Sequence, residues 1–263
     1  MQRVRLRYAK RGRLRFSSHR DFARAFERAL RRAGVPVAFS AGFTPHPKVS
    51  YVGAAPTGVA SEAEYLELGL AERVDVERLR RALDECLPPG LDVLECVEAV
   101  PGTGGLAERI DASAWQVVLP GVDLAAAAAA VRALLDRDAV EVERRTKDGR
   151  RLLDARAPVV SLVAGAPPGG SAASCAILEV VVRQVTPAVR PDDVLAALRA
   201  VAGLAPTGPP RATRLAQGRL DDRGRLADPL APDRTAVLPA IEAESAPRPD
   251  EQATPSLGST SAG

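Results

Sequence analysis

The sequence predicts an α+β protein with two tandem ferredoxin-like domains, each of order β-α-β-β-α-β, and a disordered C-terminal tail. Runs with period two and runs with period 3.6 follow one another in this manner twice along the chain. With 263 residues, 46% of them hydrophobic, the chain is long enough to form two cores. From about Gln217 the periodicity is lost, and Pro, Ala, Asp, Ser and Thr predominate. We therefore expect domains at residues 1–100 and 113–216 and a tail at residues 217–263.

The first domain begins with alternating apolar and basic residues. Residues 4–8 alternate with period two, which predicts a strand with one buried face and one arginine-bearing face, and residues 13–16 continue this rhythm after a turn. Ser18, followed by Asp21 as in a capping box, begins an amphipathic helix. Further strands are expected at residues 35–40, 48–52, 64–70 and 91–97, and a second helix at residues 75–87.

The second domain follows a linker rich in Gly and Pro at residues 101–105. A tight turn at Asp148-Gly149 predicts a β-hairpin, and Pro191 begins a helix. The other expected elements are a strand at residues 115–119, an alanine-rich helix at 124–135, the hairpin strands at 140–146 and 152–155, a strand at 177–185 and a closing strand at 213–215.

Composition excludes several classes of protein. The three cysteines, Cys86, Cys96 and Cys175, form no even set and no C-x-x-C pair, so we expect neither a disulfide framework nor a metal site. No apolar run approaches the roughly 18 residues that a membrane span needs. Motifs for nucleotide binding, zinc proteolysis and serine hydrolysis are missing from the sequence, and we expect no cofactor. A cytoplasmic protein without a membrane partner fits best.

Positive charge is concentrated in the first fifty residues. They contain 13 Lys or Arg and two acids, a net charge of +11, whereas the whole chain carries +3. Such a field favours an anionic partner, and RNA is our leading interpretation, although a solvated basic surface is the ordinary alternative. Two roles stay open for Phe43: its ring stacks on an unpaired RNA base, or it packs into the hydrophobic core of the first domain. The expected nucleic-acid-binding residues are Arg13, Arg15, Arg20, Arg24, Arg28, Arg31, Phe43 and Lys48.

The only two histidines, His19 and His46, lie in the same basic segment. His19 falls in the first turn of the predicted helix, where a neutral imidazole could accept a proton from a ribose hydroxyl, and His46 lies between two prolines in a stiff loop. Both are candidate catalytic residues, and a cap or packing role is the alternative for His19. The acids Glu62, Glu64 and Glu67 are expected on the solvent face of a strand.

A second basic group surrounds the predicted hairpin turn in the second domain. Two interpretations stay open: a further phosphate-contacting patch, or charges that protect a strand edge from aggregation. The residues are Arg144, Arg145, Lys147, Arg150 and Arg151.

Three segments of the first domain carry a family resemblance. Residues 13–22 (RLRFSSHRDF), 26–34 (FERALRRAG) and 42–48 (GFTPHPK), with the later run Gly58 to Tyr65, resemble the bacterial radical SAM-associated family, a domain of unknown function. The resemblance implies a partner of a radical SAM enzyme. The chain has no C-x-x-x-C-x-x-C motif for the cluster of such an enzyme, so it would be an accessory or substrate-presenting protein.

Three functions remain open at this point. The leading one is a non-catalytic accessory protein that binds structured RNA, such as tRNA or rRNA, for a radical SAM enzyme. The second is an RNA-processing endoribonuclease-like enzyme that uses His19 or His46, by analogy with other tandem ferredoxin-like proteins. The third is an adaptor that binds the radical SAM partner but no RNA.

Overall fold

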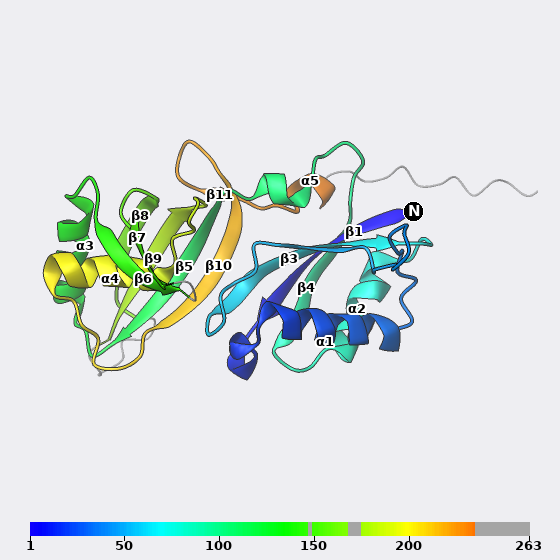
Figure 1. The fold of residues 1–263 in the computed structure, drawn as a ribbon, viewed down its shortest axis with the longest axis horizontal. Coiled ribbons are helices and arrows are strands. Elements are labelled where there is room, and N and C mark those ends of the chain that lie inside the picture. Colours follow the sequence, from blue (N-terminus) through cyan, green and yellow to red (C-terminus); the bar gives the residue numbers. More distant parts are fainter. Residues whose placement is uncertain (147–148, 168–174, 235–263) are drawn as a thin grey trace, which may run out of the picture.

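The computed structural model describes residues 1–146, 149–167 and 175–234, which form an α+β fold. A nine-stranded mixed sheet runs through the molecule, with a separate two-stranded hairpin at one end (Figure 1). No helix of the described residues is long and apolar enough to cross a membrane.

The first half of the sheet has the strand order β4-β1-β3, with β2 on the other edge of β3, and all three pairings are antiparallel. Helices α1 and α2 cover one face (Figure 1). The elements are β1 (Gln2–Lys10), the 3-10 turn η1 (Gly12–Phe16), α1 (His19–Arg32), β2 (Val49–Val52), β3 (Ala60–Leu70), α2 (Val76–Cys86) and β4 (Leu91–Glu98).

The second half repeats this arrangement with the antiparallel order β10-β5-β9-β8. Strand β10 also pairs in parallel with the start of β3, at Thr213–Ala60 and Arg214–Ser61, and so joins the halves into one sheet. The elements are η2 (Leu106–Arg109), β5 (Ala112–Pro120), α3 (Leu124–Leu135), β6 (Glu141–Thr146), β7 (Gly149–Asp154), β8 (Val159–Gly165), β9 (Cys175–Arg183), α4 (Pro191–Ala202), β10 (Arg211–Leu220), β11 (Leu226–Ala227) and α5 (Ala231–Arg234).

Each half has its own hydrophobic core. In the first, Val4, Leu6 and Tyr8 of β1 pack with apolar residues of α1, α2, β3 and β4. In the second, residues of β5 and β9 pack with α3 and α4. A small third cluster, which includes Tyr65, Leu106 and Leu230, lies where the halves meet.

Two predictions for the first half are wrong. Residues 13–16 form the 3-10 turn η1 because Gly12 adopts a positive φ of 55° and reverses the chain; Leu14 N then donates to Arg11 O at 3.0 Å. Residues 35–40 form no regular strand but two isolated bridges, Val37–Leu70 and Phe39–Pro47. A run of four to six alternating residues does not show whether another strand lies close enough to pair with it, so alternation alone mispredicted both segments.

In the second half, strand β8 was not expected from the sequence. A β-bulge between Val159 and Ser161 shifts the pairing register of β8 with β9, so the apolar and polar residues of β8 do not alternate with period two. The predicted hairpin exists as β6 and β7, but it forms its own two-stranded sheet. Its turn residues 147–148 lie outside the described residues.

The predicted start of the tail at Gln217 is also wrong. Strand β10 continues to Leu220, and β11 and α5 follow. Leu230 and Asp233 are buried, because they contact the first half of the chain rather than their sequence neighbours. Residues 235–263 lie outside the described part, which leaves the rest of the predicted tail untested.

Candidate nucleic-acid interface

Helix α1 begins with a complete capping box. Asp21 N donates to Ser18 Oγ at 3.2 Å, and Ser18 N donates to Asp21 Oδ2 at the same distance. Hydrogen bonds from Ser18, together with Arg24 and Arg20, lower the pKa of Asp21. The cap fixes where the helix starts, and thereby which residues face outward.

The inner face of α1 is held by aromatic packing. Phe22 stacks on Tyr8 of β1 with ring centroids 4.3 Å apart, and Phe26 follows one turn later. Ala29 and Leu30 complete the buried stripe. Because the inner face is fixed in this way, the opposite face must point to solvent.

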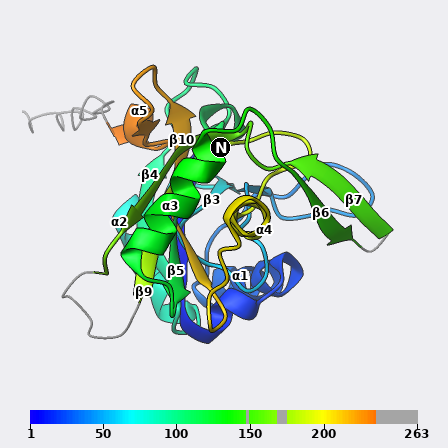
Figure 2. The same cartoon turned by 90° about the vertical axis from the view of Figure 1, so that its left-hand side faces the viewer.

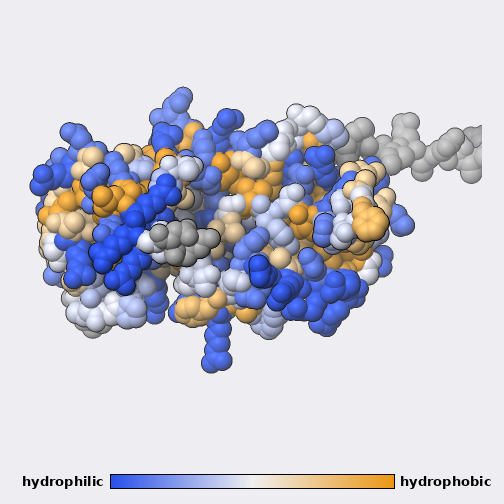
Figure 3. Space-filling model, viewed as in Figure 1, coloured by the Kyte–Doolittle hydropathy of each residue, from blue (hydrophilic) through white to orange (hydrophobic). Residues whose placement is uncertain are grey.

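The outer face of α1 carries an exposed basic ridge. Arg20, Arg24 and Arg28 follow at four-residue intervals, and Arg31 continues the row. Among the described residues, no carboxylate forms an ion pair with any of these four. Figure 3 shows strongly hydrophilic side chains gathered over α1. The sequence predicted this ridge, and we call it the α1 ridge.

Turn η1 extends the basic surface beyond the start of α1. Arg13 is exposed, and Arg15 lies over the ring of Phe16 at 4.5 Å from its centroid. This cation–π contact keeps both a guanidinium and a half-exposed aromatic ring at the surface. Turn η1 therefore presents a positive charge, from Arg13 and Arg15, next to an aromatic ring, Phe16, on which a base can stack.

The loop between α1 and β2 carries the other predicted residues. Phe43 is 106% exposed, so of its two predicted roles it does not fill the core. Lys48 lies elsewhere: with Arg3 and Glu67 it lines a hollow of about 350 Å³ on the sheet face turned away from α1. The structure thus separates Lys48 from the α1 ridge.

The arginines of β1 lie next to acids, and Arg5 is enclosed with its partners inside the fold. Arg5, with a 2% exposed side chain, donates through Nη1 to Asp233 of α5 at 2.8 and 2.9 Å and through Nε to Glu67 at 2.9 Å. Arg109 donates to the same Asp233 at 2.6 Å. These residues were not recognised from the sequence, since Asp233 lies in the stretch that the pattern assigned to the tail.

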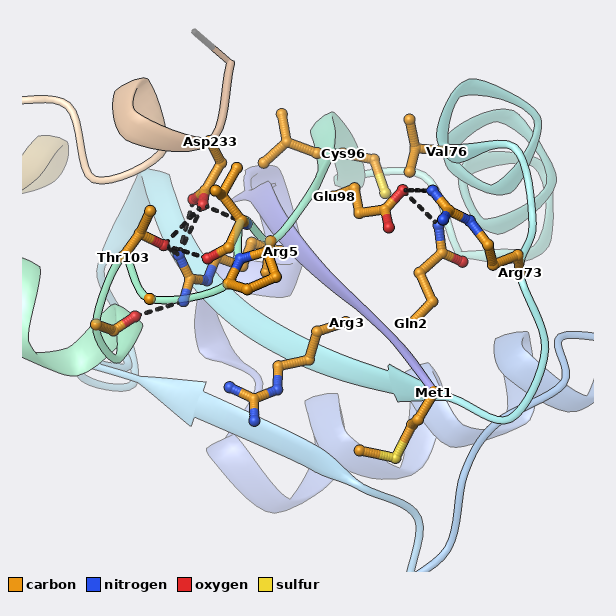
Figure 4. Close-up of a pocket in the computed structure, with 16 residues that line it drawn as sticks. Met1, Gln2, Arg3, Arg5, Arg73, Val76, Cys96, Glu98, Thr103 and Asp233 are labelled. Atoms are coloured by element: carbon orange, nitrogen blue, oxygen red, sulfur yellow. Dashed lines mark hydrogen bonds and ion pairs between the residues drawn. The ribbon is translucent and has the colours of Figure 1, made fainter. Parts of the chain in front are cut away.

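These pairs border a hollow of about 1020 Å³ between β1, β4, the start of α2 and residues 99–104 (Figure 4). Its polar groups mostly bind one another: Arg73 and Gln2 both donate to Glu98, each at 3.0 Å. Burial raises the pKa of Cys96 to about 12, which keeps its thiol protonated. The hollow therefore offers few groups that a ligand could engage.

The two histidines occupy different surroundings. His19 is exposed, meets Tyr51 edge-on at 4.8 Å, and borders a small cavity that Lys10 and Glu64 also line. His46 borders the hollow that holds Lys48. The two cavities share no lining residue, so the structure does not bring the histidines together as an acid–base pair.

The small cavity next to His19 contains buried ionic groups that the sequence did not indicate. Glu64, expected on a solvent face, is 2% exposed and pairs with Arg214 of β10. Lys10 donates to the carbonyls of Ala55 and Pro56 at 3.2 and 3.3 Å, and burial lowers its pKa. The strand pairing of β3 with β10 covers this acid, which explains the wrong prediction for Glu64.

In the described part of the chain, no group of three or more His, Cys, Asp or Glu side chains is arranged to hold a metal ion. The cysteines lie on three separate elements, α2, β4 and β9.

Comparison with known families adds one match. A family model described as "Uncharacterized protein conserved in bacteria (DUF2344)" matches residues 3–191. The match includes the α1 ridge and the hairpin and ends at the first residue of α4. A search of curated proteins found no match.

Proposed function

The chain belongs to DUF2344, a family of uncharacterized bacterial proteins, and on that premise we propose that it binds structured RNA through η1 and the α1 ridge. The observation that carries the proposal is the α1 ridge itself, whose four exposed arginines have no carboxylate partner among the described residues. The planar, positively charged guanidinium group of arginine can donate two parallel hydrogen bonds to the oxygens of one phosphate.

The spacing of the α1 ridge favours a polyanion over a solvated surface. Like charges at i and i+4 destabilise a helix by a few tenths of a kcal/mol per pair, and Arg20, Arg24 and Arg28 form two such pairs in sequence. A phosphate chain removes this repulsion and releases its own counterions. An RNA backbone would therefore offset the mutual repulsion of these arginines.

Exposed aromatic rings point to RNA with unpaired bases. Phe43 is fully exposed, and Phe16 and Phe39 are more than half exposed. All three belong to the first half, as does the α1 ridge. Unpaired bases of RNA stack on such rings, whereas a purely helical nucleic acid would not use them.

The resemblance to the radical SAM-associated family extends the proposal to a partner. In this view the chain presents a bound RNA, such as tRNA or rRNA, to a separate radical SAM enzyme that carries the iron–sulfur cluster. The supporting fact is the missing C-x-x-x-C-x-x-C motif, which leaves the cluster to another protein.

The test measures affinity for a labelled RNA stem–loop by fluorescence anisotropy at several salt concentrations. Arg24→Ala/Arg28→Ala should weaken binding about tenfold or more, because each charged hydrogen bond contributes roughly 1.5–3 kcal/mol. The salt slope should fall by about 1.4–1.8. The control is Arg132→Ala/Arg199→Ala, which removes two exposed arginines of α3 and α4 and should change neither value.

Undetectable RNA binding by the wild type, or binding that salt does not weaken, would refute the proposal. Copurification of a radical SAM enzyme by a chain that binds no RNA would favour the adaptor function instead.

One observation supports an enzyme as the second candidate: His19 borders the cavity that Lys10 and Glu64 line. If His19 removes a proton from a ribose hydroxyl, labelled RNA should be cleaved by the wild type and by His46→Ala, but not by His19→Ala. Intact RNA in all three incubations would contradict the enzyme function and agree with a binding protein.

A further inference from the structure

The β6–β7 hairpin is the second exposed basic element of the molecule. Its base is fixed: Val142 and Leu153 belong to the second core, and Arg144 donates to Asp193 of α4 through Nε at 2.9 Å and to Ala188 O at 2.7 Å. Toward the tip, Arg145, Arg150 and Arg151 are exposed. A base fixed by these contacts, with exposed arginines beyond it, is suited to hold a ligand at a defined place.

The hairpin is not the guarded edge of the main sheet. It forms a sheet of its own, and β8 is the edge strand of the nine-stranded sheet on that side. Its charges can therefore protect the two edges of the hairpin itself, but not the edge of the main sheet, and the interpretation as a phosphate-contacting patch stays open beside this one.

The register of the hairpin places like charges opposite each other. Arg144 faces Arg151, and Arg145 faces Arg150, in two successive cross-strand pairs. Like charges in this arrangement destabilise a hairpin. Arg144 is neutralised by Asp193, and Arg150 lies 3.1 Å from the exposed Glu143. In the described residues no carboxylate pairs with Arg145 or Arg151, so each of the two cross-strand pairs keeps one arginine available to a bound anion.

The hairpin and the α1 ridge share one side of the molecule. In Figure 2 the β6–β7 hairpin extends to the right of the picture, and α1 lies below it and reaches toward the same side. Figure 3 shows strongly hydrophilic side chains over both elements on the same face, one in each half of the molecule. A single extended polyanion can therefore reach both.

The two elements differ in the parts of RNA that they can contact. The first half combines arginines with the exposed rings of Phe16 and Phe43, whereas the hairpin, residues 141–154, contains no aromatic residue. Arginines without rings contact phosphates and carry no base recognition. Rings with arginines suit unpaired bases.

We infer that the β6–β7 hairpin binds the phosphates of a base-paired RNA stem whose unpaired nucleotides occupy the α1 ridge, so that the substrate class is a stem–loop or a stem with a single-stranded extension. This inference rests on the proposed RNA-binding function and adds the second contact site to it. Base-paired RNA is recognised mostly by shape and backbone, which agrees with exposed arginines and no aromatic ring on the hairpin.

The experiment compares two labelled RNA probes: a stem–loop with a stem of about 16 base pairs, and the isolated loop strand. The hairpin variant is Arg145→Ala/Arg150→Ala/Arg151→Ala. It should bind the stem–loop about tenfold or more weakly, with a salt slope lower by about 2–3, and should bind the loop strand like the wild type. The matched control, Arg132→Ala/Arg137→Ala/Arg199→Ala, removes three exposed arginines of the second half and should leave both affinities unchanged. Unaltered urea midpoints for both variants show that the fold is intact.

Four results have distinct meanings. If the hairpin variant keeps its stem–loop affinity and salt slope while Arg24→Ala/Arg28→Ala loses affinity, the inference is wrong and the proposed function stands. If the hairpin variant weakens both probes equally, the assignment of the stem to the hairpin is wrong. If Arg24→Ala/Arg28→Ala affects neither probe, the proposed function itself fails. Loss confined to the stem–loop supports the inference.

Discussion

Strand β1 and helix α1 are rich in the same residue, arginine, and lie within the same 32 residues, yet the structure uses them differently. On β1, Arg5 is enclosed by Glu67 and Asp233, and Arg7 lies 3.7 Å from Glu95. On α1, Arg24 and Arg28 face solvent without a carboxylate partner among the described residues. The charge count of the segment, +11, therefore overstates the charge that an external ligand meets.

The contrast between the arginines of β1 and those of α1 comes from what packs against each element. Strand β1 lies in the middle of a sheet between β3 and β4, and segments from elsewhere in the chain, including α5, cover Arg5. Helix α1 has the sheet on one side only (Figure 1). The arginines of α1 stay available to an external anion because, among the described residues, no carboxylate forms an ion pair with them.

The largest expected effect comes from breaking the enclosed pair on β1. Asp233→Asn leaves the largely buried Arg109 without its carboxylate and leaves Arg5 with Glu67 alone. Removal of one partner of a buried ion pair costs about 3–5 kcal/mol. The free energy of unfolding in urea measures this loss. The comparison variant Arg24→Ala/Arg28→Ala should change it by less than about 0.5 kcal/mol. Equal losses in the two variants would mean that β1 and α1 do not differ in the way described.

A smaller effect is expected from the cap of α1. Ser18→Ala removes the hydroxyl that accepts from Asp21 N, and such a substitution costs about 1 kcal/mol. Urea unfolding should register this loss, while RNA affinity of the folded protein should stay near that of the wild type because the arginines remain. A loss of affinity comparable to that of Arg24→Ala/Arg28→Ala would show that the α1 ridge needs the cap for its geometry as well as its stability.

The smallest effect is expected in the acid dependence of stability. Burial alone would raise the pKa of Asp233, but hydrogen bonds from Arg109 and Arg5 outweigh burial and hold the pKa below its ordinary value of 3.8. The folded state thus binds the proton less readily than the unfolded state, so the stabilisation is present above pH 3.8 and is lost as pH falls through the lower, folded pKa. Urea midpoints between pH 5 and 3 should fall less steeply for Asp233→Asn than for the wild type. Parallel pH curves for the two proteins would contradict this.

Much of the candidate interface could be predicted from the sequence. The capping box, the buried stripe of Phe22 and Phe26 and the outward arginines follow from a period of 3.6 residues, which is a local property. The exposure of Phe43 did not follow, since a lone aromatic in a loop packs inward or outward according to the surface beside it. The position of Lys48, away from the α1 ridge, did not follow from the sequence either, because it depends on how β2 pairs with β3.

The sequence by itself determined the α+β class, most helices and strands, the order of elements in the first half, and the α1 ridge. Only the tertiary structure decided that β10 joins the two halves, that a bulge hides β8, and that α5 lies over β1. The physical reason is distance along the chain. Periodicity and caps act within a few residues, whereas the carboxylate that neutralises Arg5 lies 228 positions away and can be found only once the chain is folded. The sequence shows where arginines accumulate, and packing decides which of them remain at the surface.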